Sequence, residues 1–255
     1  MKRWARRLGI SVSLVTVFVG FALWAAAFRT PSINRLPIPT ALVAADTQAG
    51  QQLLSEKGFL SDYEGLTRNF ESQSRRGFCG VASSVVVLNA LRTPAPRLTQ
   101  SNFFTEATNK VRTSFQITFS GMTLAELGKL LQAHGARVTV HYAADSSLDA
   151  FRSVARQNLA TVNDFLIVNY QRAALGQSEI GHISPIAAYN LDTDRLLILD
   201  VASYNYPPVW ISTEMLWKAM NTVDPASGRT RGFAIVTEPN KPLHATALKN
   251  AARER

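Results

Sequence analysis

Apolar side chains recur at helical spacing in the first half of the chain. Residues 80–91 form a nearly unbroken run of small and aliphatic side chains, which predicts a helix that is buried on almost all sides. Leucines spaced along 123–134, with Thr123 three residues before Glu126, predict a helix that begins with a capping box. Further helices are expected over 100–112 and 149–159.

The second half of the chain has the short, branched, alternating runs of strands. Turn residues separate these runs, and a helix is expected over 213–221, before the last of them. The runs cover residues 137–142, 164–170, 182–189, 195–201 and 232–237. Helices first and strands afterwards predict an α+β fold with an antiparallel sheet.

An uncharged stretch of 19 residues, 9–27, lies near the N-terminus behind a basic start. Its length is at the lower edge of what spans a bilayer, and Ala25 to Ala27 offer the small residues of a cleavage site. Residues 1–29 are therefore expected to be a retained membrane anchor or a cleaved signal peptide, with a buried soluble helix as the alternative. Either targeting role places the rest of the chain in the bacterial periplasm, secreted or anchored to the inner membrane.

The remainder divides into three parts. Residues 30–45 contain three prolines and little periodicity, which indicates a linker, and residues 238–255 form a basic tail. Between them, residues 46–237 show no internal repeat and are expected to be a single domain.

The charge balance follows this division. Of 255 residues, 27 are basic and 18 acidic, a net charge of +9 that would ordinarily raise nucleic acid as a partner. Residues 1–29 hold five basic and no acidic side chains, and residues 238–255 hold four basic and two acidic ones. The part in between is nearly neutral, so nucleic acid is not expected as a partner.

Cys79 is the only cysteine and stands at the start of the buried helix. The backbone N–H groups of a helix N-terminus stabilise a thiolate, so Cys79 is a candidate nucleophile. Gln73, six residues earlier, could donate with the Cys79 backbone N–H to an oxyanion. The alternatives are a small buried cysteine and a solvated loop glutamine.

A thiolate nucleophile needs an imidazole that acts as acid and base. The chain has four histidines, and three of them, His134, His141 and His244, have a structural explanation at a helix end, on a strand and in the basic tail. His182 follows Gly181 at the opening of a strand and is the candidate partner of Cys79.

The partner of His182 follows from the register of the hairpin. A symmetric pairing about residue 192 sets Ser184 opposite Asp200, so that Asp200 shares the face of His182 at roughly 7–8 Å between Cα atoms. A one-residue bulge would change this face. The alternative is an aspartate that begins a turn at the strand end.

Several segments resemble the phytochelatin synthases. These segments are Phe78-Cys79-Gly80-Val81-Ala82-Ser83, Val87-Leu88-Asn89-Ala90-Leu91, Gly121-Met122-Thr123-Leu124, Val168-Asn169-Tyr170, Gly181-His182-Ile183-Ser184-Pro185, Ala188-Tyr189-Asn190, Leu199-Asp200-Val201, Tyr206-Pro207-Pro208-Val209-Trp210 and Thr230-Arg231-Gly232-Phe233. They occur in order across roughly residues 50 to 237.

The resemblance implies a papain-like cysteine protease fold, with Cys79 on a helical lobe and His182 and Asp200 on an antiparallel sheet lobe. It implies a γ-glutamylcysteinyltransferase that cleaves the Cys–Gly bond of glutathione through a thioester on Cys79. The thioester then passes to water or to another glutathione, which makes phytochelatin. By position, Cys79 matches the nucleophile, His182 the acid and base, Asp200 its orienting group and Gln73 the oxyanion donor. The γ-glutamyl group is expected at Asn169, Arg172, Asp224 and Arg231.

No cofactor or metal site is expected in the protein, because one cysteine and four scattered histidines give no ligand spacing. Cadmium or zinc would enter as the thiolate complex of glutathione, so glutathione and its metal complexes are the expected partners. The C-terminal tail contains no cysteine, which resembles the short bacterial members, where deglycination dominates. The sequence leaves open whether the protein forms a homodimer.

Two other functions stay open. One is a papain-like peptidase for leader or other small peptides, because such enzymes also place a glutamine before Cys-Gly and a histidine and an aspartate after it. The other is a membrane-tethered module that binds thiols or metals through Cys79 without turnover.

Overall fold

The computed structural model describes residues 20, 24, 25, 27–92 and 96–239. Its order of elements is β1 (Val43–Ala44), α2 (Gln48–Ser55), β2 (Gly58–Phe59), α3 (Tyr63–Arg68), α4 (Cys79–Leu91), α5 (Glu106–Val111), α6 (Ser114–Ser120), α7 (Leu124–Ala133), β3 (Arg137–Tyr142), η1 (Ala143–Asp145), α8 (Leu148–Leu159), β4 (Asp164–Gln171), η2 (Arg172–Leu175), β5 (Gly181–Asn190), β6 (Arg195–Ile198), β7 (Val209–Ser212), α9 (Thr213–Met220) and β8 (Gly232–Thr237). The fold is α+β, with most helices in the N-terminal half.

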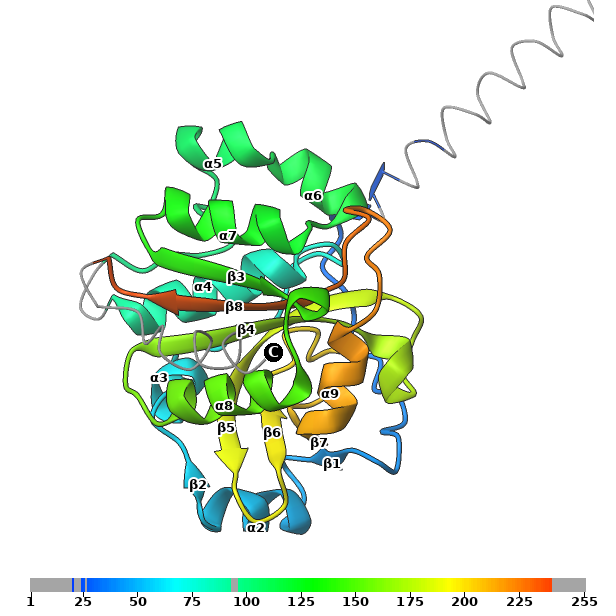
Figure 1. Ribbon diagram of the computed structural model, residues 1–255. Coiled ribbons are helices and arrows are strands. Elements are labelled where there is room, and N and C mark those ends of the chain that lie inside the picture. The colour runs from blue at the N-terminus through cyan, green and yellow to red at the C-terminus, as the bar shows by residue number, and fades with distance from the viewer. Residues whose placement is uncertain (1–19, 21–23, 26, 93–95, 240–255) are drawn as a thin grey trace, which may run out of the picture.

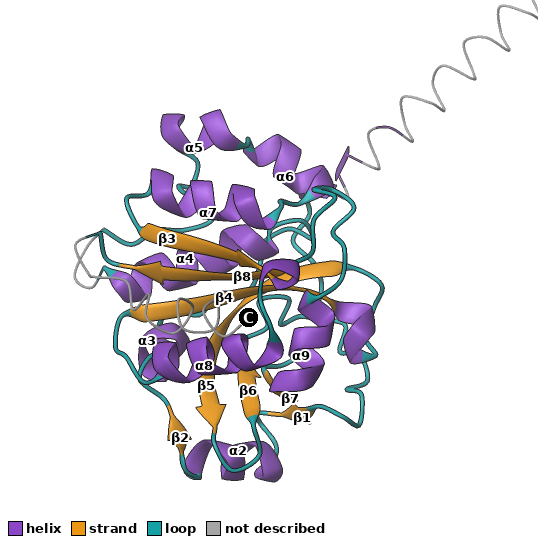
Figure 2. Ribbon diagram, in the orientation of Figure 1, coloured by secondary structure: helices purple, strands orange, loops and turns teal. Residues whose placement is uncertain are grey.

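One antiparallel sheet organises the molecule. Its strands follow the order β1-β7-β6-β5-β4-β8-β3, and β2 pairs with the far end of β5. Figure 2 shows α8 and α9 on one face of the sheet, with α3 and α4 on the other. Two apolar clusters fill the two sides: α4 and α7 pack with one, and α8 and α9 with the other.

The strongly patterned elements form as expected. Helix α4 buries ten of its residues, including Val85 and Leu88, because its run of small and aliphatic side chains leaves no polar face. The Thr123 hydroxyl oxygen accepts from the backbone N–H of Glu126, and the Glu126 carboxylate accepts from the backbone N–H of Thr123, which confirms the predicted capping box.

Two expectations about the helical half need correction. The segment 100–112 holds only the short helix α5, because Thr105 caps a helix there and Thr113 caps the separate helix α6. The early part of the chain also contributes two strands, β1 and β2, which extend the sheet at sites far along the sequence.

The segment 30–45 is folded onto the domain, whereas it was expected to be a linker. Val43 pairs with Trp210 through β1 and β7, and Leu42 is buried. Asn34 and Leu36 donate their backbone N–H groups to the carbonyls of Tyr204 and Asn205, and the Arg35 guanidinium donates to the Ser203 carbonyl. We call residues 34–36 the N-terminal strap.

The predicted targeting segment 9–27 lies mostly outside the described residues, as do residues 240–255 of the predicted tail. In the described part of the chain, none of the helices is both long and apolar enough to cross a membrane.

Candidate active site

Cys79 is the first residue of α4 and remains partly exposed while the helix behind it is buried. Burial raises the pKa of its thiol. A hydrogen bond with His182 and the positive charge of that imidazole lower the pKa and outweigh the effect of burial. Hydrogen bonds with the backbone of Ile183 and Gly80 act in the same direction, so the pKa falls below its usual value. The site therefore favours a thiolate.

His182 lies at the start of β5, and its Nε2 is 2.9 Å from Oδ1 of Asp200. Burial and the nearby Arg172 cation lower the pKa of this imidazole. The charge and hydrogen bond of Asp200, and the hydrogen bond with Cys79, outweigh them and raise the pKa above its usual value. The imidazole is thus held between a thiol and a carboxylate and favours its charged form.

Asp200 is fully buried, and its Oδ1 accepts three hydrogen bonds. Besides His182, the donors are Nη2 of Arg172 at 2.7 Å and the backbone N–H of Ala202 at 2.9 Å. Burial alone would raise the pKa of the carboxyl, but His182 and Arg172 lower it to about 2. The second oxygen, Oδ2, has no hydrogen-bond partner among the described residues.

A β-bulge brings Asp200 to the face of His182. Near the turn, Asn190 pairs with Arg195, so the expected symmetric register about residue 192 is wrong there. The register shifts by one residue around Ala187, and beyond this point Ile186 pairs with Ile198 as that register requires. Strand β6 ends at Ile198, earlier than expected, and Asp200 lies in the following loop.

Two neighbours fix this geometry, and neither was singled out from the sequence. Tyr170 on β4 is directly opposite His182 on β5, and the two rings meet edge to face with centroids 5.7 Å apart. Ser83 on α4 donates its hydroxyl to the carbonyl of Ile183 at 3.0 Å, which ties the helix of the thiol to the strand of the imidazole. The register of β4 and β5 was the signal that could have found Tyr170.

Gln73 is buried beside the loop that carries Asp200. Its backbone N–H donates to the carbonyl of Val201 at 2.8 Å. Its side-chain Nε2 donates to the carbonyl of Arg76 at 3.0 Å and to the hydroxyl of Tyr204 at 2.8 Å. Both amide hydrogens are thus engaged, and Oε1 is buried without a partner among the described residues.

Three of the four predicted γ-glutamyl contacts, Asn169, Asp224 and Arg231, are connected through the sheet register and one ion pair. Asn169 is buried on β4 opposite Gly232, the residue after Arg231. Nη2 of Arg231 lies 3.8 Å from Oδ1 of Asp224, and a side chain placed at Gly181 would come within 2.8 Å of the same nitrogen. Nε of Arg231 is buried without a partner in the described part of the chain.

Arg172, the fourth, is directed away from this group. Its side chain is 1% exposed, and its Nη1 donates to Oε1 of Gln177 at 2.5 Å while its Nη2 binds Asp200. The guanidinium also stacks on Tyr206, 5.0 Å from the ring centre. This placement favours a role behind the imidazole over the expected contact with substrate.

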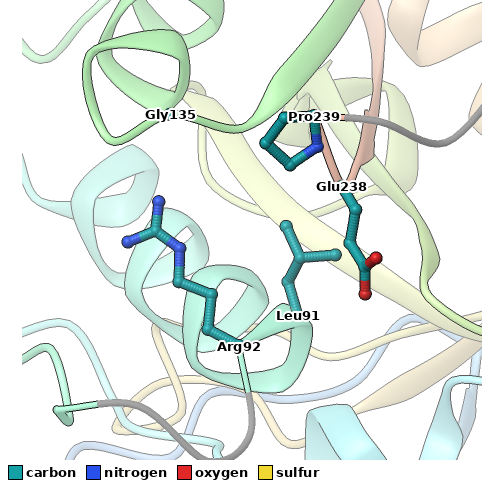
Figure 3. A pocket seen from close by; sticks show the side chains of 5 residues that line it. All are labelled: Leu91, Arg92, Gly135, Glu238 and Pro239. Carbon is teal, nitrogen blue, oxygen red and sulfur yellow. The ribbon is translucent and has the colours of Figure 1, made fainter.

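Among the residues that the structure describes, no three His, Cys, Asp or Glu side chains are grouped so that they could hold a metal ion. A cavity of about 240 Å³ lies at the other end of α4 from Cys79, lined by Leu91, Arg92, Gly135, Glu238 and Pro239 (Figure 3). It is separate from the candidate site.

Comparison with known proteins finds relatives that share one name. The chain is 36% identical over 211 residues to glutathione gamma-glutamylcysteinyltransferase 1 of Lotus japonicus, which covers 81% of this chain and 42% of the relative. It is 34% identical over 198 residues to glutathione gamma-glutamylcysteinyltransferase 2 of Arabidopsis thaliana, covering 75% and 44%. The enzyme of the same name from Schizosaccharomyces pombe is 27% identical over 218 residues, covering 83% and 53%.

The chain thus spans about half the length of the curated relatives it matches, or less. Among protein families, the match is to phytochelatin synthase, over residues 33–233. This range begins with the N-terminal strap and ends on β8, so it contains Cys79, His182 and Asp200 together with the sheet that positions them. The chain belongs to the phytochelatin synthase family.

Proposed function

We propose that this protein is a thiol acyltransferase and hydrolase that acts on glutathione. The observation that carries the proposal is the chain of contacts from Cys79 through His182 to Asp200, in a member of the phytochelatin synthase family. A thiolate held against an imidazolium, with the imidazole oriented by a carboxylate, is the arrangement that acyl transfer through a thioester requires.

The fold that we propose is papain-like. Cys79 begins a buried helix on one side of the sheet, and His182 and Asp200 come from β5 and from the loop after β6. The nucleophile and its base thus lie on separate parts of the fold, which meet at one end of β5.

In the proposed reaction, Sγ of Cys79 attacks the carbonyl carbon of the Cys–Gly bond. The C–N bond breaks, and His182 gives its proton to the nitrogen of the departing glycine. The thioester that remains on Cys79 is then attacked by water or by the amine of a second glutathione, and His182 takes up the proton of that attacking group. Water gives γ-glutamylcysteine, and glutathione gives a longer (γ-Glu-Cys)n-Gly chain.

We assign the oxyanion of this reaction to the N-terminus of α4, with the backbone N–H of Cys79 as donor. Gln73 joins this set if its Nε2 exchanges the hydrogen bond to Tyr204 for the oxyanion. The Tyr204 hydroxyl keeps the amide beside the Asp200 loop until then.

The γ-glutamyl end of glutathione carries one amino and one carboxylate group, which call for opposite charges. Arg231 offers its charge and an Nε that has no partner among the described residues for the carboxylate, and Asp224 offers the charge for the amine. Asn169 lies beside them in the sheet register. We place Arg172 outside this clamp, because Asp200 and Gln177 occupy its guanidinium.

The experiment is to incubate the full chain with glutathione, with and without cadmium or zinc ions, and to resolve the products by mass. We expect free glycine and γ-glutamylcysteine, with longer products if transfer competes with water. A Cys79→Ser control should release no glycine. Intact glutathione under every condition, in folded protein, would contradict the proposal and would leave a peptidase or a binding module.

The same assay ranks the two partners of Cys79. We expect His182→Ala to lose more activity than Asp200→Ala, because the imidazole moves the proton and the carboxylate only orients it. Full activity in Asp200→Ala would contradict the assigned role of this carboxylate.

A further inference from the structure

Four aromatic rings lie next to one another on the side of α6, and three of them are exposed while Phe28 is half-buried. Phe28 lies 5.9 Å from Phe119 and 6.4 Å from Phe115 between ring centroids, and Trp24 lies 5.0 Å from Phe28. The side chains of Trp24, Phe115 and Phe119 are 49%, 60% and 53% exposed. We call these four residues the aromatic patch.

The aromatic patch differs from the rest of the described surface. Eight large hydrophobic side chains are exposed among the described residues, and all three aromatic ones belong to this patch. Helix α6 has no charged residue along its length. Single exposed aliphatic side chains are normal on a protein surface, whereas adjoining exposed aromatic rings indicate an interaction surface.

The sequence before the patch indicates what covers it. Trp24 stands in the last part of the uncharged stretch 9–27. Phe28 and Arg29 follow directly after the end of this stretch. Figure 1 shows the described N-terminal residues beside α6, so the chain reaches the folded domain at this patch. Tryptophan at the end of an apolar segment is typical of the boundary between lipid and water.

We propose that the aromatic patch rests in the headgroup region of a lipid bilayer and fixes the orientation of the catalytic domain on the membrane. The uncharged stretch 9–27 leads into the bilayer, and Phe115 and Phe119 lie at the depth of Trp24. A stable protein partner would need roughly 20–30 residues on this side, far more than four rings supply. Arg29 and Arg75 at the edge of the patch favour anionic headgroups.

The patch adjoins the loop that leads to the nucleophile. The Arg75 guanidinium stacks on Phe28 and on Phe78, 4.7 Å from each ring centre. It also donates to the hydroxyls of Ser114 and Thr118 on α6, at 3.1 and 2.9 Å. A bilayer under α6 would therefore hold the side of the domain from which residues 73–79 approach the active site.

The test depends on the chain having only one cysteine, because replacing it leaves a new cysteine as the only site for a label. In the full-length Cys79→Ser protein, Phe119→Cys or Leu60→Cys provides one site for an environment-sensitive fluorophore. Leu60 is also an exposed hydrophobic residue, but it lies next to β2 at the opposite end of the molecule in Figure 1. Each labelled protein is reconstituted into vesicles of phosphatidylcholine and phosphatidylglycerol.

We expect the emission at position 119 to shift to shorter wavelength and to rise severalfold in vesicles, while the emission at position 60 stays unchanged. The shift should not depend on the ratio of protein to lipid when lipid is in excess. Failure of the protein to float with the vesicles, no shift at position 119, or equal shifts at both positions would overturn the proposal. A shift that grows with protein per vesicle would also overturn it, since that result indicates contact between copies.

Discussion

The carboxylate of Asp200 binds two cationic side chains of the site. Arg172 and His182 bind the same oxygen, and neither the carboxylate nor the guanidinium is accessible to water. A buried charge that loses its partner is costly, so the three groups depend on one another.

Arg172→Met tests this dependence. The substitution leaves the buried Asp200 charge with one cation fewer, and we expect the free energy of unfolding at neutral pH to fall by about 3–5 kcal/mol. Arg68→Met is the matched control, because Arg68 pairs with Glu64 in an exposed position. Exposed pairs contribute about 0–1 kcal/mol, so a loss in the control as large as that in Arg172→Met would contradict the expectation.

The pH dependence of the same variant has a definite sign. Asp200 has a folded pKa of about 2, below the value of about 3.9 in an unfolded chain. Its charge therefore stabilises the fold above about pH 4, and this contribution is lost as the pH falls toward 2. Without Arg172 the pKa of Asp200 in the folded protein rises. Urea unfolding measured between about pH 2 and 7 should therefore show that Asp200 contributes less to the free energy of unfolding, and that this contribution is lost at a higher pH than in the unsubstituted protein.

Tyr204 acts on the site through Gln73. Tyr204→Phe removes the oxygen that accepts from Nε2 of Gln73, so the amide loses its fixed orientation. We expect kcat for glycine release to fall by up to about tenfold with KM nearly unchanged, less than the roughly 100-fold loss of an oxyanion donor. In a Gln73→Ala background, Tyr204→Phe should have no additional effect. Equal effects in both backgrounds would show that Tyr204 acts independently of Gln73.

At the scale of elements, the site depends on how α4 is set against β5. Ser83 and Ser84 are adjacent, buried and chemically identical, but they bind different partners. The Ser83 hydroxyl crosses to the carbonyl of Ile183, whereas the Ser84 hydroxyl returns to the carbonyl of Gly80 within its own helix.

This pair separates stability from positioning. Ser83→Ala and Ser84→Ala should each lower the free energy of unfolding by about 1 kcal/mol, because each removes one hydrogen bond. Only Ser83→Ala loosens the thiol from the strand of its imidazole, so it should show the larger loss of kcat. Similar kcat values in the two variants would indicate that packing alone holds α4 against β5.

Sequence patterns predicted the elements whose signals are local. The apolar run of α4 and the capping box of α7 each lie within a few residues, and both formed as expected. The split between α5 and α6 was missed because Thr113 caps a new helix at the point where the first one ends. The position of the bulge around Ala187 could not be predicted either, because a bulge depends on the pairing with neighbouring strands and not on the local sequence alone.

At the scale of the whole molecule, the N-terminal strap binds the loop that follows Asp200, although the two segments are far apart in the sequence. Residues 34–36 bind the loop of residues 203–205, and β1 pairs with β7. The irregular, proline-containing sequence of 30–45 predicted a linker because the contacts that order this segment are supplied by residues far along the chain. Composition reports local preference, and it contains no information about such partners.

Truncation tests the strap. A chain that begins at residue 30 keeps every described contact of residues 34–45, and it should release as much glycine from glutathione as the full chain. A chain that begins at Asp46, the boundary expected from the sequence, loses the strap and β1, and it should lose most activity and unfold at lower urea concentration. Equal activity in the two fragments would show that the loop after Asp200 needs no support from the N-terminus.

The distance along the chain between the strap and its loop also orders events in time. Arg35 and Ser203 are 168 positions apart, so the strap leaves the ribosome long before the loop that it binds has been synthesised. Contacts of such separation form late and slow folding. The loop that follows Asp200 therefore gains its contacts with the N-terminal strap only after both ends of the domain have been synthesised.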